Sequence, residues 1–324
     1  MSSHFKETWS TVGLFFYIMK AVCKSSMQYL GRRSLFQQTK TQIRRFGLSK
    51  STVVGLHGNE SRKSRQRVFS SVSDEEVVKF AKLSESWWDP QQNPLIGMNS
   101  VRVKYIVDQI CNTSRSAEVN AHDGRLPPLS GLKAVDVGCG GGLLSESLAR
   151  LGADVVAVDP SQALIEHAQY HSQMDPRTRS IDYRGGYTIE KLAKEVADPC
   201  FDIICILEVI EHVTDAESIL ESAKTLLKPN TGRLFLSTMN RTIKSQIVAI
   251  IGAEYVMRYL PIGTHDWDRF LSPQEVELLM NRAGLHQIDV QGMVIDKPPF
   301  HGCWGWKLDR EDTDINWIGT YTAA

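Results

Sequence analysis

Two carboxylates and one imidazole stand close together in the sequence, at Glu208, Glu211 and His212, and we call them the trio. If a helix begins at Glu208, the three side chains occupy positions i, i+3 and i+4 and share one face. Such a face is a plausible site for a divalent cation. Mg²⁺ prefers the oxygens, and the imidazole makes Mn²⁺ or Zn²⁺ conceivable. The alternatives are that the acids only favour a helix N-terminus, and that His212 packs on a substrate or acts as a general base.

A glycine-rich turn supplies the second chemical signal. Residues 136–142 read D-V-G-C-G-G-G, after an apolar stretch and before a helical one. Glycines let the backbone approach a ligand closely, and the N-terminus of the following helix offers free N–H groups. A dinucleotide site of the G-x-G-x-x-G type requires a third glycine where Leu143 stands. A nicotinamide cofactor is therefore disfavoured, although an NAD-dependent oxidoreductase remains an alternative.

An acid at the end of the next apolar stretch strengthens the interpretation of this turn. Asp159 follows V-V-A-V and lies 21 residues after Gly138. A carboxylate at that point can accept hydrogen bonds from both ribose hydroxyls of a cofactor. The alternative is that Asp159 caps the next helix. Together, the glycine turn and Asp159 predict a cofactor that carries a nucleoside.

Strand-like and helix-like patterns alternate through the body of the chain. We expect strands at residues 134–137, 155–158, 181–183, 201–207, 233–238, 285–295 and 316–322. We expect helices at residues 73–83, 101–110, 143–151, 163–171, 216–227 and 273–283. Capping boxes mark two of the helix starts, Ser73 with Glu76 and Ser272 with Glu275. The alternation predicts an α/β fold, with a doubly wound, mostly parallel sheet of seven strands and helices on both faces.

Four of these segments resemble, in the right order, the motifs of class I S-adenosylmethionine-dependent methyltransferases. They are the glycine turn, Asp159, F-D-I-I-C-I-L-E at residues 201–208 and L-K-P at residues 227–229. Other segments are not shared by methyltransferases at large: W-W-D at residues 87–89, E-V-I-E-H-V at 208–213, S-T-M-N-R at 237–241 and G-T-H-D at 263–266. With them, the chain from about residue 80 to its end resembles the ubiquinone-biosynthesis O-methyltransferase family.

This resemblance implies a function and a set of site residues. The methyl donor is S-adenosylmethionine, and the acceptors are catechol-type hydroxyls of polyprenylated intermediates, at the polyprenyl dihydroxybenzoate and demethylubiquinol steps. The residues implied to contact the cofactor are Arg102, Gly138, Asp159 and Leu207. The trio is implied to bind a divalent metal, with Mg²⁺ expected first and Mn²⁺ or Zn²⁺ as alternatives. Two other functions stay open, namely methylation of another small-molecule acceptor and a non-catalytic role in a quinone-synthesis complex.

The N-terminal part of the chain has a different composition from the rest. The first 70 residues hold 13 Lys and Arg against two acids, and no acid lies between Glu7 and Glu60. An Arg-rich, Ser-rich, acid-poor start is typical of a mitochondrial transit peptide, and the alternative is a disordered basic tail. We expect this head to cover residues 1–69, with cleavage after Phe69 or, less well matched, after Phe46. A helical extension at residues 70–130 and the methyltransferase domain at residues 131–324 follow.

Charge and hydropathy constrain the partners and the location. Beyond residue 70 the chain carries 24 basic and 35 acidic residues, which argues against nucleic-acid binding. No stretch is long and apolar enough to span a bilayer. The lid-like insertion at residues 240–266 is either a pair of helices on the core or a surface that lies on a membrane. We expect a protein of the mitochondrial matrix, peripheral on the inner membrane and in contact with other components of a quinone-biosynthesis complex.

Overall fold

The computed structural model of the protein describes residues 71–90, 92–93, 95–112, 126–246, 266–297 and 305–323. The chain divides into two units, Met1–Val68 and Phe69–Ala324. The predicted transit peptide and both of its cleavage sites therefore lie outside the described residues, as do residues 247–265 of the predicted lid. Among the described residues, no helix combines the length and the apolar character that crossing a membrane requires.

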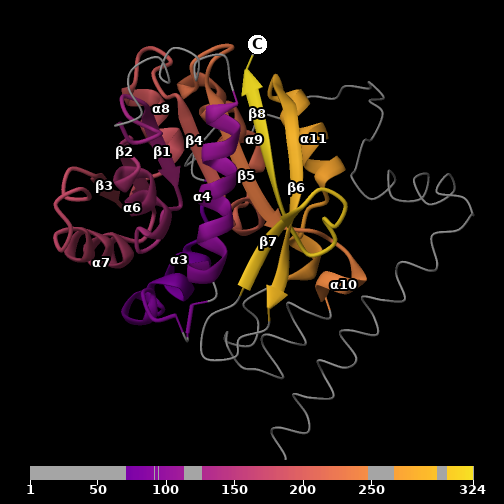
Figure 1. Ribbon diagram of the computed structural model, residues 1–324, viewed down its shortest axis with the longest axis horizontal. Coiled ribbons are helices and arrows are strands. Elements are labelled where there is room, and N and C mark those ends of the chain that lie inside the picture. The colour runs from indigo at the N-terminus through magenta and orange to yellow at the C-terminus, as the bar shows by residue number, and fades with distance from the viewer. Residues whose placement is uncertain are drawn as a thin grey trace, which may run out of the picture. The chain divides into compact units, whose positions relative to one another are not determined.

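The described part of the chain forms one eight-stranded sheet in the order β3-β2-β1-β4-β5-β8-β6-β7 (Figure 1). β1 to β5 pair in parallel, whereas β8, β6 and β7 join them through antiparallel pairs. The strands are β1 (Lys133–Val137), β2 (Asp154–Asp159), β3 (Asp182–Gly185), β4 (Ile203–Leu207), β5 (Arg233–Met239), β6 (Leu285–Lys297), β7 (Gly305–Asp309) and β8 (Asn316–Ala323).

This topology confirms the predicted doubly wound α/β class and corrects the number of strands. Seven were predicted, each of which corresponds to an observed strand, and the eighth is β7. β7 was missed because its alternation of apolar and polar residues, W-K-L-D, is only four residues long, the shortest run that indicates a strand. It pairs with β6 at one edge of the sheet and lies against helix α4.

Helices cover both faces of the sheet, as the β-α alternation predicts (Figure 1). One face packs against α4 (Leu95–Cys111), α6 (Leu143–Arg150) and α7 (Gln162–Ser172), and the other against α8 (Ile189–Glu195), α9 (Ala216–Leu226) and α11 (Pro273–Arg282). The predicted capping box of α11 is confirmed, because Ser272 and Glu275 satisfy each other's backbone N–H groups. α8 is a helix that the sequence patterns did not reveal.

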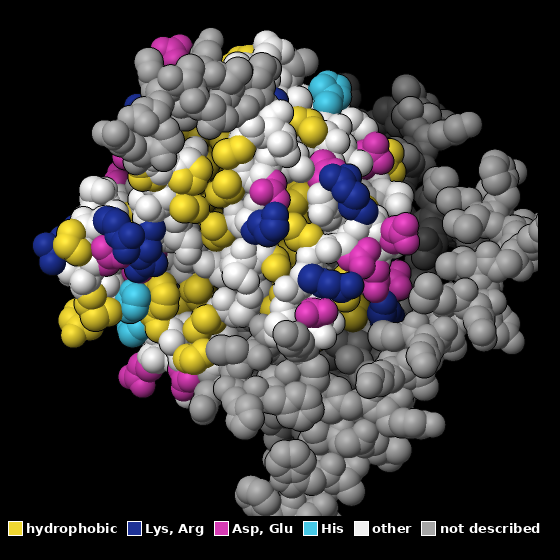
Figure 2. All heavy atoms as spheres, in the orientation of Figure 1, with side chains coloured by type: hydrophobic (Ala, Val, Ile, Leu, Met, Phe, Trp, Pro, Cys, Tyr) yellow, Lys and Arg dark blue, Asp and Glu magenta, His cyan; other side chains and the backbone are white. Residues whose placement is uncertain are grey.

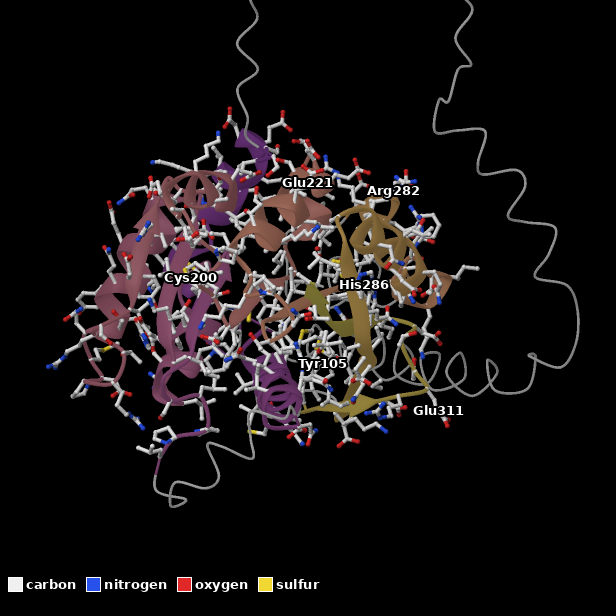
Figure 3. All side chains as sticks on the ribbon, turned by 90° about the horizontal axis from the view of Figure 1, so that it is seen from above. Tyr105, Cys200, Glu221, Arg282, His286 and Glu311 are labelled. Carbon is white, nitrogen blue, oxygen red and sulfur yellow. The ribbon has the colours of Figure 1, made fainter. Side chains whose placement is uncertain are left out.

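Helix α4 begins earlier than predicted and joins the two halves of the sheet. The side chain of Asn93 accepts the backbone N–H of Leu95 and so caps the helix well before residue 101. Further along α4, the buried Tyr105 points toward the strands (Figure 3), where its hydroxyl accepts from Thr320 and donates to the backbone carbonyl of Asp289. α4 therefore reaches the antiparallel strands as well as the parallel ones.

The segment before α4 departs from its predicted local structure. Helix α3 spans Asp74–Ala81, and a 3-10 turn follows at Ser84–Ser86. The predicted capping box is wrong, because the Ser73 side chain makes no capping hydrogen bond and Glu76 instead contacts His212. α3 has no buried residue of its own. Its position depends on contacts with the C-terminal ends of the parallel strands, which are described below.

Candidate active site

A pocket opens where the parallel strands β1, β2 and β4 end, which is where doubly wound sheets bind ligands. Its empty space, open mouth included, is about 1170 Å³, so it can take a ligand of the size of a cofactor. Of the predicted cofactor residues, Gly138, Asp159 and Leu207 line this pocket, and so does the whole trio. Arg102 is not part of the lining, but its guanidinium pairs with Glu208, which is.

The glycine turn forms the floor of the pocket beside β2. Gly138 has a φ of 67°, and its N–H donates to the backbone carbonyl of Val158, 2.8 Å away. Gly140 has a φ of 55°, and a Cβ at this position would overlap the ring of Trp87. Both positions therefore require glycine, one for its conformation and the other also for the close approach of an indole. The turn presents backbone to the pocket, as the sequence predicts.

Asp159 lies at the end of β2 and is tied to the same turn. Its carboxylate accepts the N–H of Ser161 at 2.7 Å and that of Gly140 at 2.9 Å. Burial nevertheless outweighs these two hydrogen bonds and raises the pKa of Asp159 to about 6. Two donors use only half of the acceptor capacity of a carboxylate, so the ribose interaction that the sequence predicts is available here.

Glu208 is held by a buried ion pair. Its Oε1 atom lies 3.0 Å from Nη2 of Arg102 and accepts a hydrogen bond from the Ser237 hydroxyl at 2.7 Å. Nε of Arg102 is buried and has no hydrogen-bond partner among the described residues. Arg102 therefore links the predicted cofactor set to the trio, and it keeps a donor for a further anionic group.

The trio does not share a helix face, which corrects the sequence-based argument. Glu208 follows β4 in the left-handed region, at a φ of 56°, and Ile210–His212 forms only a 3-10 turn. A β4 strand that ends on a left-handed residue cannot continue as the predicted α-helix. All three side chains still line the same pocket, where the charges of Glu208 and His212 act on Glu211. In the part of the chain that the structure describes, no group of three or more His, Cys, Asp or Glu side chains is arranged to hold a metal ion.

Glu211 is the least compensated member of the trio. It is 4% exposed, and neither of its carboxylate oxygens has a hydrogen-bond partner among the described residues. Burial, followed by the charge of Glu208, raises the pKa of Glu211 above its ordinary value. A buried carboxylate without a partner is costly, which makes this position a candidate for a ligand or a cation.

His212 belongs to a dyad that sequence reasoning missed. Its Nδ1 lies 2.9 Å from Oε2 of Glu76 on α3, and Phe80 packs edge-on against the imidazole at 4.9 Å. The hydrogen bond with His212 holds the pKa of Glu76 below its usual value. An ionised carboxylate can only accept, so Nδ1 is the donor, and in the neutral form of the ring Nε2 keeps its lone pair. The only sequence signal for Glu76 was a helix cap, because the two residues are far apart in the chain.

The start of the described chain completes one wall of the pocket. Val72 forms an isolated antiparallel bridge with Val213, and the backbone carbonyl of Ser71 accepts from both the N–H and the hydroxyl of Thr214. The Ser71 hydroxyl donates to the buried Glu190 at the N-terminus of α8. Residues 71–81, which we call the strap, thus close over the trio. The sequence placed this segment outside the methyltransferase domain.

Comparisons with known proteins agree with this geometry. A family model described as a methyltransferase domain matches residues 118–290. A protein named ubiquinone biosynthesis O-methyltransferase from Azorhizobium caulinodans is 44% identical over 257 residues, which cover 78% of this chain and 95% of that protein. A protein of the same name from Rhodopseudomonas palustris is 42% identical and covers 79% of this chain and 95% of its own length.

A solved structure shares the fold at much lower sequence identity. Magnesium protoporphyrin IX methyltransferase from Synechocystis PCC 6803, solved with bound SAH, aligns with a TM-score of 0.52 and 18% identity over 78% of this chain and all of its own. This likeness confirms the Rossmann-like methyltransferase fold, and the relatives above carry the narrower assignment. The chain is therefore an S-adenosylmethionine-dependent methyltransferase and belongs to the family of ubiquinone biosynthesis O-methyltransferases.

Proposed function

We propose that this protein transfers the methyl group of S-adenosylmethionine to a catechol-type hydroxyl of polyprenylated intermediates in ubiquinone biosynthesis. One observation carries the proposal: Gly138, Asp159 and the trio line a single pocket. Gly138 and Asp159 offer backbone and a ribose acceptor, and the trio offers carboxylates and an imidazole. A methyl donor and a phenolic acceptor can therefore meet within the same cavity.

The cofactor half of the pocket is already organised. The turn at Gly138 and Gly140 is fixed by the N–H groups that it donates to Val158 and Asp159. When bound, S-adenosylmethionine supplies an electrophilic methyl group on a sulfonium. Three groups of the chain would hold it: Asp159 would accept from the ribose, the glycine turn would lie along the methionine end, and the unpartnered Nε of Arg102 would be available to an anionic group.

The acceptor half supplies a base. His212 donates a hydrogen bond from Nδ1 to Glu76, so Nε2 of the neutral ring is the atom that can accept a phenolic proton. Glu76 fixes the orientation of the ring and stabilises the imidazolium that forms. The same arrangement also suits a metal ligand, because ligating histidines commonly donate their other N–H to a carboxylate.

We also propose that a divalent cation assists, with the trio as its ligands. The donor set fits: Glu211 has two buried oxygens without partners, Glu208 adds a second negative charge, and His212 presents Nε2. A hard cation such as Mg²⁺ suits the carboxylates, and Mn²⁺ or Zn²⁺ suits the imidazole. A cation held there would lower the pKa of a chelating catechol. Glu208 would have to leave its ion pair with Arg102 to join such a site, because the trio is not gathered in the present arrangement.

The test is a turnover assay on the purified protein with S-adenosylmethionine and a short-tailed catechol, followed by mass spectrometry of the product. The matched control acceptor carries the same tail but has its two hydroxyls meta to each other, so that it cannot chelate a cation. We expect methylation of the catechol only, and its loss in chelator with recovery on added Mg²⁺. Failure to methylate the catechol contradicts the proposed acceptor. Full activity in chelator contradicts the metal and leaves His212 as the base.

We further propose that the protein works in the mitochondrial matrix, peripheral on the inner membrane and beside other quinone-biosynthesis proteins. The basic, acid-poor composition of residues 1–69 supports import. On the face drawn in Figure 2, basic and acidic side chains are interspersed, which does not favour nucleic acid as a partner. Import into isolated mitochondria, followed by carbonate extraction, tests the location. A protein that stays outside the organelle contradicts it.

A further inference from the structure

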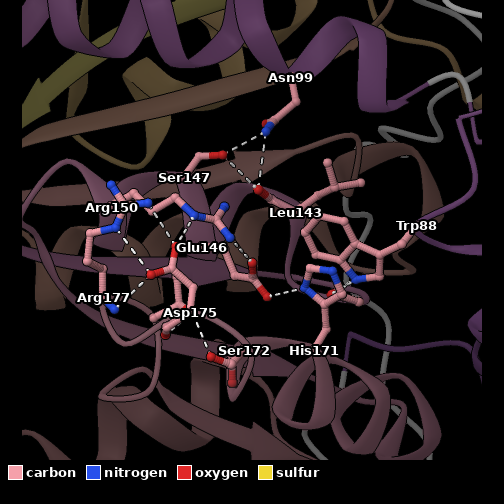
Figure 4. A network of polar contacts seen from close by, with 12 residues as sticks. Trp88, Asn99, Leu143, Glu146, Ser147, Arg150, His171, Ser172, Asp175 and Arg177 are labelled. Carbon is pink, nitrogen blue, oxygen red and sulfur yellow. Dashed lines mark hydrogen bonds and ion pairs between the residues drawn. The ribbon is translucent and has the colours of Figure 1, made fainter.

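A polar and aromatic cluster lies next to the glycine turn but outside the pocket. Its centre is Glu146 on α6, which is fully buried and whose two carboxylate oxygens meet His171 of α7 and Arg150 of its own helix (Figure 4). The distances are 2.7 Å from Oε1 to Nδ1 of His171 and 2.6 Å from Oε2 to Nη2 of Arg150. A buried carboxylate is tolerated when both oxygens are paired, so Glu146 fixes the orientation of the imidazole.

The imidazole of His171 in turn holds Trp88. The two rings stack with their centroids 3.6 Å apart and their planes within 8° of each other (Figure 4). The indole N–H of Trp88 donates to the backbone carbonyl of Gly141 at 3.0 Å. Gly141 belongs to the glycine turn, which forms the floor of the cofactor pocket. A chain of contacts therefore leads from the buried Glu146 through two rings to the backbone of the turn.

Trp87 completes the contact from the pocket side. Its indole lies so close to Gly140 and Gly141 that a Cβ on either residue would overlap it. Trp87 also lines the pocket, whereas Trp88, His171 and Glu146 do not. The turn is thus held by one indole through shape and by its neighbour through a hydrogen bond.

We propose that Trp88 and His171 are positioning residues for the cofactor: they set the affinity for S-adenosylmethionine from outside the pocket by holding the carbonyl of Gly141. The inference rests on the cofactor half of the proposed function and not on the identity of the acceptor. The turn has left-handed residues at Gly138, Gly140 and Gly142, and such a backbone has many alternatives when it is not held. Ordering it in advance removes a cost that binding would otherwise carry.

Three substitutions in the full chain separate the contacts. Trp88→Phe keeps a ring for stacking and removes the N–H donor to Gly141. His171→Asn keeps a donor for Glu146 and removes the ring on which Trp88 stacks. His171→Ala removes both. The matched control is His286→Ala, the same chemical change at an exposed position of β6 (Figure 3).

The measurements are the dissociation constant of S-adenosylhomocysteine by calorimetry, the KM values for cofactor and acceptor, and the melting temperature. Loss of one neutral hydrogen bond predicts an affinity for S-adenosylhomocysteine about threefold to tenfold weaker in Trp88→Phe. We expect His171→Ala to lose at least as much affinity as Trp88→Phe. The loss in His171→Asn should lie between those of the wild type and His171→Ala. The KM for the cofactor should rise while the KM for the acceptor and kcat stay near wild type. A merely structural role would instead lower the melting temperature and leave the affinity of the folded fraction unchanged.

Two results would overturn the proposal. One is an unchanged affinity for S-adenosylhomocysteine in folded Trp88→Phe together with folded His171→Asn. The other is an equal rise of both KM values. If His171→Ala does not fold, the two conservative variants still decide the question. Because binding of S-adenosylhomocysteine is measured without acceptor, a wrong assignment of the acceptor leaves this test intact.

Discussion

Replacing Asp159 by Asn tests the cofactor site with the smallest change in shape. The carboxylate accepts backbone N–H groups from Ser161 and Gly140 and keeps a second acceptor position on each oxygen. In Asp159→Asn one oxygen becomes an NH₂ group that faces one of these N–H donors and cannot accept from ribose. The other oxygen remains an acceptor but is no longer charged.

The magnitude follows from this count of hydrogen bonds. One charge-assisted bond to ribose is lost and one becomes neutral, so we expect binding of S-adenosylhomocysteine to weaken by about 2–3 kcal/mol. This corresponds to about a 30-fold to 150-fold higher dissociation constant. Asp154→Asn is the matched control, because Asp154 is the exposed first residue of the same strand.

The pKa of Asp159 adds a second signature. Burial raises this pKa to about 6, so the carboxylate takes up a proton as the pH falls through that value. If the cofactor binds the ionised form, wild-type affinity should be about tenfold weaker at pH 5 than at pH 8. Asp159→Asn should lack this dependence. Calorimetry across this pH range is the assay. An Asn variant within threefold of wild type at pH 7.5, or a wild-type affinity that does not change with pH, refutes the assignment.

Three further predictions concern the rest of the molecule. If the trio binds one cation, each single Ala substitution should abolish most turnover, and the triple substitution should lower kcat/KM little further. The measurement is kcat/KM with and without chelator. If His212 is instead a metal-free base, only His212→Ala should lower kcat/KM severely. Deleting residues 1–69 should leave a soluble, active enzyme that no longer enters mitochondria, whereas deleting residues 1–77 should also abolish activity because it removes the Glu76 partner of His212. Burial raises the pKa of Asp136 from 3.8 to about 7, so the free energy of unfolding should fall as the pH rises from 4 to 7. Asp136→Asn should remove a part of that fall on the order of 4 kcal/mol. Denaturant titrations at several pH values measure it, and an equal fall of the free energy of unfolding in both proteins would contradict the prediction.

The strands and most helices could be predicted because their signals are local. A continuous apolar run identifies β4, whose five residues are all buried, and capping chemistry identifies the start of α11. The start of α4 was expected at residue 101 but lies at Leu95, whose N–H donates to the side chain of Asn93. β7 has only a four-residue alternation, and its place in the sheet depends on β6 and α4, which lie beside it. Such an element depends on tertiary context, which overrides propensity.

The part of the pocket that contains the glycine turn and Asp159 was predictable for the same reason. The glycine turn and Asp159 lie at the ends of adjacent parallel strands, so the fold class alone brings them together. The conformation of Glu208 was not predictable. Its left-handed φ belongs to a turn that a β-strand, a buried ion pair with Arg102 and a hydrogen bond from Ser237 impose together. A spacing of i, i+3 and i+4 has meaning only where a helix exists.

The acceptor half depends on contacts between residues that are distant in sequence. His212 pairs with Glu76, which lies 136 residues earlier, and the bridge between Val72 and Val213 brings the strap to the same place. No side chain of α3 is fully buried, so the helix is held by these contacts together with the edge-on packing of Phe80 against His212. The dyad therefore has two consequences: it sets the tautomer that leaves Nε2 of His212 free, and it fixes the strap over the pocket. A substitution of Glu76 should disturb both, which separates its role from that of Glu211, whose carboxylate has no such partner.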